Sequence, residues 1–241
     1  MESIKELYKT IENSSLSVLS ARPGCFMPTL LSQLIIEYGL NANKKVTIFM
    51  QENTSWLTSH ILSTLLEKPH NEVLPYLLPL TFYKSNRKPI DHEKLCQNIE
   101  KLYKSSIDIE DLTTYRKEYI DTIVKNIEEA DEKPDFIIIY GFENLFRDAT
   151  YSPREILKKI EHLVKMNIKI ILIAKMERSV EDSTVQNFED IHNYNELKMF
   201  ANFFLIIETA IERENENAKI KIKTTAGDFT ATYDYQKSTL E

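Results

Sequence analysis

The chain has 241 residues, of which 42% are hydrophobic and 28% are charged, and this is enough for one folded domain with a hydrophobic core. Its formal net charge of −7 argues against a broad nucleic-acid-binding surface, because such surfaces are usually basic. Cys25 and Cys96 form no metal-binding or redox motif, and no apolar run is long enough for a membrane span or a signal peptide. We therefore expect a reduced, cytoplasmic protein without a membrane segment.

The first predicted unit is a strand, a loop and a helix. An apolar run at residues 16–19 predicts a buried strand, and a loop with Pro23 and Gly24 follows. The next apolar stretch predicts a helix that begins at Thr29 and ends at Gly39. This order is the outline of a phosphate-binding loop.

The residues of that loop do not match a working phosphate site. Such a loop ends in Gly-Lys-Thr or Gly-Lys-Ser, whereas Met27 and Pro28 precede Thr29 here. The whole chain has only four glycines, although about seventeen are expected at the usual frequency of roughly 7%. Glycine lets backbone N–H groups converge on a phosphate, so this composition disfavours such a site.

The remaining pattern predicts an α/β domain with one mostly parallel sheet. Apolar runs separated by helical segments indicate parallel strands covered by helices on both faces. The final strand alternates in polarity and runs into Gly227-Asp228, which predicts an antiparallel hairpin turn. No linker or repeat interrupts the pattern, so we predict a single domain over residues 1–241. The other predicted strands cover residues 46–50, 106–111, 135–140, 168–174, 203–209 and 218–224, and the other predicted helices cover 54–67, 91–103, 113–130 and 153–166.

Six stretches in order resemble the C-terminal, RecA-like ATPase domain of DnaB-type replicative DNA helicases. The resemblance extends from about residue 4 to about residue 235 and implies a RecA-like P-loop NTPase fold. The six stretches read "LSVLSARPGCFMPTLLSQLI", "VTIFMQENTSWLTSHILS", "DFIIIYGFENLF", "IKIILIAKMERSVED", "DIHNYNELKMFANFFLIIE" and "AKIKIKTTAGDF".

The resemblance also implies where ATP and Mg²⁺ chemistry belongs, and most of the expected residues are replaced. Met27 and Pro28 stand at the Gly-Lys positions, while Thr29 retains the hydroxyl that contacts Mg²⁺. Tyr140 stands where the family has the Mg²⁺-side aspartate. Glu52 matches the glutamate that orients the attacking water.

Two further positions complete this comparison. Lys175 replaces a glutamine that senses the γ-phosphate. In the family's K-x-R-x-G strand, Lys223 and Gly227 match, but Thr225 replaces the arginine finger. The lysine, aspartate, sensor and finger are therefore all lost, which indicates a pseudo-ATPase with a vestigial site and no expected cofactor.

Each surviving residue has a structural and a functional interpretation. Arg22 braces its loop or contacts an anion. Glu52 is a structural acid at a strand end or a remaining base. Lys175 pairs with an acid such as Glu52 or replaces the lost loop lysine. Tyr140 fills the vanished metal site. The five histidines have no ligand spacing and are expected to be ordinary surface residues; they are His60, His70, His92, His162 and His192.

The expected partners follow from the same comparison. In the family, loops after the strand that matches residues 168–174 line a DNA channel, but residues 177–190 contain five acids and one arginine here, which predicts weak or no nucleic-acid binding. The family's N-terminal domain and linker helix have no counterpart in the sequence, so we expect a monomer or dimer rather than a hexamer.

The leading hypothesis is a catalytically degenerate RecA-like binding or scaffold module that docks on an active helicase or another RecA-like protein. It would then be linked to DNA replication or to a mobile element. One alternative is an ATP-dependent helicase or NTPase that uses Glu52, Lys175 and Lys223 in an unusual arrangement. A third hypothesis is a nucleotide sensor that binds ATP without hydrolysis.

Overall fold

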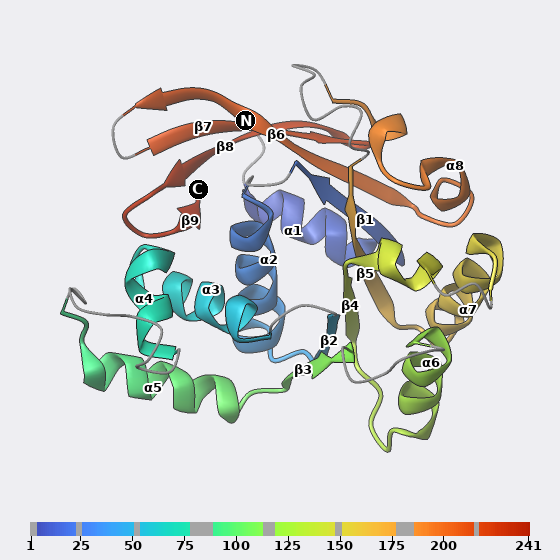
Figure 1. Ribbon diagram of the computed structural model, residues 1–241, viewed down its shortest axis with the longest axis horizontal. Helices are drawn as coiled ribbons and strands as arrows, with labels where there is room; N and C mark the ends of the chain where they lie inside the picture. Colours follow the sequence, from blue (N-terminus) through green and yellow to red (C-terminus); the bar gives the residue numbers. More distant parts are fainter. Residues whose placement is uncertain are drawn as a thin grey trace.

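A computed structural model describes residues 4–22, 26–50, 54–77, 89–112, 119–147, 151–176, 186–214 and 217–241. These residues form a mixed α/β structure around one nine-stranded sheet with the strand order β3-β2-β4-β5-β1-β6-β7-β8-β9. Helices cover both faces of the sheet (Figure 1). The predicted fold class is confirmed.

Six strands form the parallel part of the sheet, as the continuous apolar runs predict. Their register is in phase at the centre, where Leu19 of β1 lies opposite Ile173 of β5 and Leu205 of β6. Both faces of these central strands are buried, which explains why their sequences do not alternate in polarity. In sheet order the six are β3 (Ile107–Asp111), β2 (Val46–Met50), β4 (Phe136–Tyr140), β5 (Lys169–Lys175), β1 (Leu16–Ala21) and β6 (Phe203–Glu214).

The sheet continues with three antiparallel strands, β7 (Asn217–Thr224), β8 (Gly227–Asp234) and β9 (Thr239–Leu240). Thr224 pairs with Gly227, so the tight turn consists of residues 225–226. The predicted turn at Gly227-Asp228 is therefore wrong by two residues. The Thr224 hydroxyl accepts a hydrogen bond from the Ala226 N–H and donates to the Gly227 carbonyl, and this side-chain contact closes the turn earlier than the glycine suggests.

Two helical layers enclose the sheet (Figure 1). One face is covered by α1 (Ile4–Asn13), α2 (Met27–Ile35) and α3 (Thr54–Leu66), which share a core with alternate residues of the strands. The other face is covered by α6 (Tyr119–Glu129), α7 (Pro153–Lys165) and the short α8 (Tyr194–Leu197). Outside α3, α4 (His70–Leu77) and α5 (His92–Tyr103) add a smaller cluster. We call the first of these layers the α2 face of the sheet.

The predicted helix ends agree with the structure where a capping side chain sets them. The Asp91 carboxylate accepts the Lys94 N–H at 3.0 Å and starts α5. Ser152 and Glu155 form a reciprocal capping box that starts α7. Both boundaries were predictable because the acceptor precedes the first apolar turn.

The helix after β1 differs from the prediction. It starts at Met27 rather than Thr29, and it does not end at Gly39 but continues as a π-helical segment, Ile36–Asn41. A Cβ on Gly39 would lie 2.4 Å from Cγ1 of Ile107. Gly39 therefore permits close packing of the helix against the start of β3 instead of terminating the helix.

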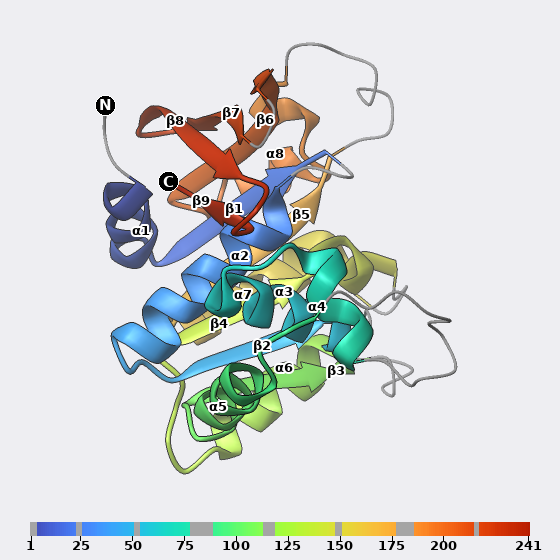
Figure 2. The same ribbon diagram turned by 90° about the vertical axis from the view of Figure 1, so that its left-hand side faces the viewer.

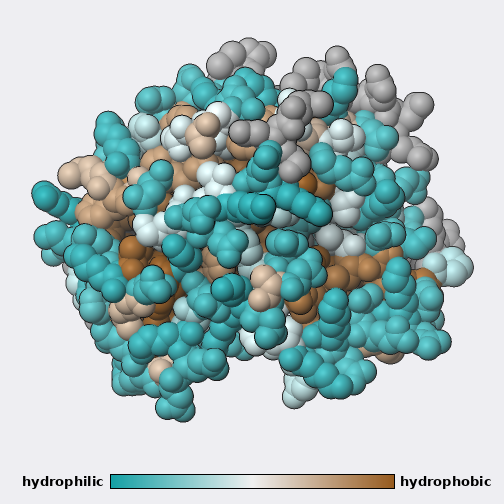
Figure 3. Space-filling model, turned by 180° about the vertical axis from the view of Figure 1, so that it is seen from behind, coloured by the Kyte–Doolittle hydropathy of each residue, from teal (hydrophilic) through white to brown (hydrophobic). Residues whose placement is uncertain are grey.

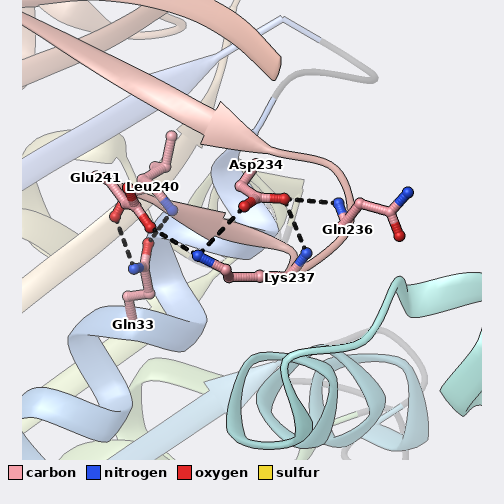
Figure 4. Close-up of polar contacts among 6 residues, drawn as sticks. All are labelled: Gln33, Asp234, Gln236, Lys237, Leu240 and Glu241. Atoms are coloured by element: carbon pink, nitrogen blue, oxygen red, sulfur yellow. Dashed lines mark hydrogen bonds and ion pairs between the residues drawn. The ribbon is translucent and has the colours of Figure 1, made fainter. Parts of the chain in front are cut away.

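The C-terminal residues are fixed against α2 (Figures 2 and 4). The Gln33 side chain donates to the Leu240 carbonyl and accepts from the Leu240 N–H, both at 3.0 Å. Lys237 forms ion pairs with Asp234 and Glu241 on the same turn. The end of the chain thus closes over the helix that follows the phosphate-loop position.

The outer surface gives no sign of a membrane contact in the described part of the chain. None of the helices described is both long enough and apolar enough to cross a bilayer. Figure 3 shows one face of the molecule, on which hydrophobic residues form small separate patches among hydrophilic ones.

Candidate functional site

The candidate site lies at the carboxyl edge of the parallel strands, where open α/β sheets bind their ligands. Ala21 pairs with Lys175, and Ile173 pairs with Tyr140, so β1, β4 and β5 end at the same edge. Ile171 and Ile173 pack in the core of the α2 face. By the alternation of side chains along a strand, Lys175 projects to that face, and Tyr140 packs against the same core.

The start of α2 directs its side chains into the protein core. Met27 is 6% exposed and belongs to the hydrophobic cluster of the α2 face. Pro28 occupies the first turn, where its missing N–H removes no helical hydrogen bond, and Thr29 is 5% exposed. Arg22 is half-buried directly after β1, and Gly24 lies outside the described residues. The positions that correspond to Gly-Lys therefore contribute packing and a helix start.

Tyr140 belongs to a chain of aromatic contacts that fills this face. Its ring centroid lies 5.8 Å from that of Trp56, and Trp56 lies 4.7 Å from His60 in an edge-on arrangement. His60 in turn stacks on His70, with ring centroids 3.6 Å apart and planes 1° apart. Ser59 and His70 share a hydrogen bond of 2.6 Å. This supports the interpretation of Tyr140 as a packing residue.

The histidine prediction is wrong for two of the five residues. His60 and His70 are half-buried between α3 and α4 rather than on the surface. Burial, followed by the proximity of His70, lowers the pKa of His60 to about 3, and burial also lowers the pKa of His70. Both rings are neutral at physiological pH. By contrast, His92 is exposed and His162 forms an exposed contact with Glu128, as predicted.

Lys175 is held by an acid that the sequence analysis did not single out. Its ammonium lies 3.1 Å from Oε1 of Glu143, which is only 8% exposed. Glu143 lies in the 3₁₀ turn Phe142–Arg147 after β4. Gly141 leads into this turn with a φ of 73°, a conformation that L side chains rarely adopt. The prediction that Lys175 pairs with an acid is confirmed, with Glu143 as the partner that the structure describes; Glu52 lies outside the described residues.

Lys223 does not join Lys175. Ile220 and Ile222 of β7 pack in the core of the α2 face, so Lys223 projects to the opposite face of the sheet. There its ammonium donates to the Gln186 carbonyl and to Oδ1 of Asn187. Within one chain, the structure therefore separates two of the three residues on which an unusual ATPase site would depend.

The described residues do not fit a magnesium–nucleotide site. At the end of β4, a tyrosine that packs against Trp56 stands where a carboxylate is needed to hold Mg²⁺. The start of α2 offers a buried methionine and a proline instead of a lysine. Across the described part of the chain, no three or more His, Cys, Asp or Glu side chains are grouped to hold a metal ion.

Comparison with known proteins identifies the fold but not a sequence family. No protein-family model matches the chain, and no curated protein matches it significantly in sequence. Among solved structures, a DnaB-like replicative helicase, whose structure concerns its interactions with primase, superposes with a TM-score of 0.69 at 11% identity, over 99% of this chain and 67% of that chain. The fold is that of a DnaB-like helicase ATPase domain. A second solved structure, also of an ATPase domain, gives a TM-score of 0.71 at 12% identity over 94% of this chain and 84% of that chain.

The DnaB-like fold is thus shared while the sequences have diverged almost completely. Sequence reasoning missed Glu143 because it occupies a turn with no motif of its own. Its only signal was the glycine at Gly141 directly after a buried strand, which is where a chain turns at a sheet edge. It also missed the stacking of His60 on His70, because the two rings come from different helices.

Proposed function

We propose that the chain is a catalytically degenerate RecA-like module that acts by binding a protein partner, and that it neither hydrolyses nor tightly binds ATP. The observation that carries this proposal is Tyr140. It ends β4 at the edge where the resemblance places the Mg²⁺-side aspartate, and its ring packs against Trp56. A packed aromatic ring cannot coordinate Mg²⁺, and it supports α3 against the sheet instead.

The energetic argument is independent of the packing argument. A hydrogen bond to a charged group contributes roughly 1.5–3 kcal/mol. Loss of the loop lysine, of one or two backbone donors and of the aspartate-held Mg²⁺ therefore removes about 4–8 kcal/mol, allowing for non-additivity. Because a micromolar site corresponds to about −8 kcal/mol, the dissociation constant for ATP becomes millimolar or weaker.

Calorimetric titration with Mg-ATP, with thermal unfolding in parallel, tests the proposal. An active DnaB-like helicase domain serves as the positive control. We expect no saturable heat below about 100 micromolar and no shift of the thermal midpoint, since a ligand stabilises only above its dissociation constant. Pro28→Lys alone should not restore binding, because Met27 and Tyr140 remain. Saturable binding below this concentration, or phosphate release that Glu52→Gln abolishes, contradicts the proposal.

The proposed partner is an active helicase or another RecA-like protein, which connects the chain to DNA replication or to a mobile element. The support is the shared fold, since RecA-like domains of this kind have surfaces that suit one another. The test mixes the purified chain with a purified DnaB-like helicase and measures complex formation by light scattering and the helicase's ATPase rate. A stable complex with a changed rate supports the proposal, and no complex at micromolar concentrations contradicts this choice of partner.

An ATP-dependent helicase or NTPase is the alternative, and the fold match to helicase ATPase domains is the observation in its favour. The projection of Lys175 and Lys223 to opposite faces of the sheet weighs against it for a single chain. A nucleotide sensor that does not hydrolyse is distinguished in the same titration, as binding without phosphate release.

A further inference from the structure

The contact between Glu143 and Lys175 is the most unusual polar feature outside the helix caps. Glu143 is 8% exposed, and its Oε1 lies 3.1 Å from the Lys175 ammonium. Within the described chain, no N–H or O–H group donates a well-aligned hydrogen bond to either carboxylate oxygen. Burying a carboxylate is costly without compensation, so the ammonium of Lys175 is the described group that stabilises its charge.

The position of this ion pair gives it a role in ligand choice. Lys175 ends β5 at the carboxyl edge of the sheet, and Arg22 follows the paired end of β1. Two cationic side chains at this edge would by themselves attract an anion. A carboxylate in contact with one of them opposes that attraction, because a negative charge a few ångströms from a bound phosphate raises its free energy.

We infer that Glu143 determines the charge preference of this edge: it serves as the internal counterion of Lys175 and excludes phosphate-bearing ligands from a site that would otherwise accept them. The inference rests on the proposed function and deepens it. Loss of the loop lysine and the magnesium ligand explains why ATP binding is weak. Glu143 explains why Lys175 does not replace the lost lysine.

The test replaces Glu143 by the neutral residue of the same shape. Glu143→Gln removes the negative charge and keeps the side-chain volume, and the probe is inorganic triphosphate without magnesium. We expect the dissociation constant to fall at least about tenfold relative to the unmodified chain, which is the effect of one adjacent unit charge on an anion. Calorimetry gives the constant, and the fluorescence of Trp56 gives an independent signal from the same face.

A matched control separates the local effect from total charge. Glu161 of α7 pairs with Lys165 at 3.1 Å on the surface, so Glu161→Gln removes the same charge away from the edge. This control should leave triphosphate binding unchanged, and the double variant Glu143→Gln/Lys175→Gln should lose the gain. If Glu143→Gln binds no more tightly than the unmodified chain, or if Glu161→Gln gains as much, the inference is overturned. Tight Mg-ATP binding by the unmodified chain would instead overturn the proposed function.

Stability measurements decide the matter if Glu143→Gln folds poorly. Lys175→Gln alone leaves the buried carboxylate without its ammonium, whereas the double variant removes both charges. If Lys175 is the counterion of Glu143, urea unfolding will show that Lys175→Gln is less stable than the double variant. Equal stability of these two variants contradicts the counterion role.

Discussion

His60 and His70 stack face to face, with their ring centroids 3.6 Å apart and their planes 1° apart. The two rings come from α3 and α4, and the Ser59 side chain shares a hydrogen bond with His70. Two protonated imidazoles at this distance repel each other, and burial disfavours even one positive charge. The stack therefore requires neutral rings.

The first prediction follows for the dependence of stability on pH. The folded-state pKa of His60 is about 3, below the ordinary value of 6.5, so its contribution is fully present above about pH 6.5 and is lost as the pH falls from there towards 3. At about pH 4.5 the loss for His60 alone is about 2–3 kcal/mol of unfolding free energy. Urea unfolding near pH 7.5 and near pH 4.5 measures it.

A non-titrating ring provides the control for this effect. His60→Phe keeps an aromatic ring in the stack, and its stability should fall less on acidification than that of the unmodified chain. His92→Phe changes an exposed histidine and should leave the acid-induced loss as it is. An identical pH dependence for all three proteins contradicts the assignment to the stack.

The second prediction concerns the contact between Gln33 and the C-terminal strand β9. Gln33→Ala removes two hydrogen bonds to the Leu240 backbone, so we expect a loss of about 1–3 kcal/mol, at roughly 0.5–1.5 kcal/mol per bond. Gln97→Ala is the control, because Gln97 makes one exposed hydrogen bond to Glu93 and should cost little. Urea unfolding compares the two variants, and similar values for both would show that the contact with Leu240 contributes nothing.

The third prediction is that the chain is a monomer or a dimer at micromolar concentration. The described surface exposes few large hydrophobic side chains, namely Ile99, Tyr103 and Met199, at 42%, 89% and 65% exposure. A closed ring needs two extensive interfaces on every subunit, and stable interfaces have an apolar core. Light scattering gives the mass directly. A stable hexamer is inconsistent with this prediction and would favour the helicase alternative.

The fourth prediction is that single-stranded DNA binds weakly or not at all at physiological salt. The net charge is −7, and several described lysines already contact acids. Lys221 lies 3.2 Å from Asp228 and 3.6 Å from Glu208, for example. Fluorescence titration with a labelled oligonucleotide should show no saturation in the low micromolar range. Tight binding that weakens steeply with added salt would reveal a basic surface, and residues Lys84, Arg87 and Lys88, which lie outside the described residues, would be the first to substitute.

The parallel part of the fold was predictable because its signals are local. Runs such as residues 135–140 contain enough consecutive β-branched residues to specify a buried strand, and Asp91 and Ser152 fix helix starts through nearby hydrogen bonds. The hairpin turn was misplaced because the Thr224 side chain closes it before the glycine. The helix end at Gly39 was predicted wrongly because Gly39 accommodates Ile107, a residue distant in sequence.

The candidate site was less predictable than the fold. The sequence indicated that Lys175 pairs with an acid, but the identity of Glu143 depends on how the chain turns at Gly141. The opposite orientations of Lys175 and Lys223 depend on the register of β7 against β6, which no local pattern states. The positions of Met27, Pro28 and Tyr140 were known from the resemblance, and the structure adds that Met27 and Tyr140 take part in packing.

The place of β1 in the sheet has a consequence for how the chain folds as it is synthesised. β1 is near the start of the sequence, yet it lies between β5 and β6, and its Ser20 hydroxyl bonds to a carbonyl of Ala174, 154 positions later. Neither neighbour of β1 exists until most of the chain has left the ribosome, and contacts between such distant segments form slowly because of the entropy of loop closure. Until then, the apolar strand and the apolar helix after it remain without their sheet, and they are the segments that a chaperone would be expected to protect during synthesis.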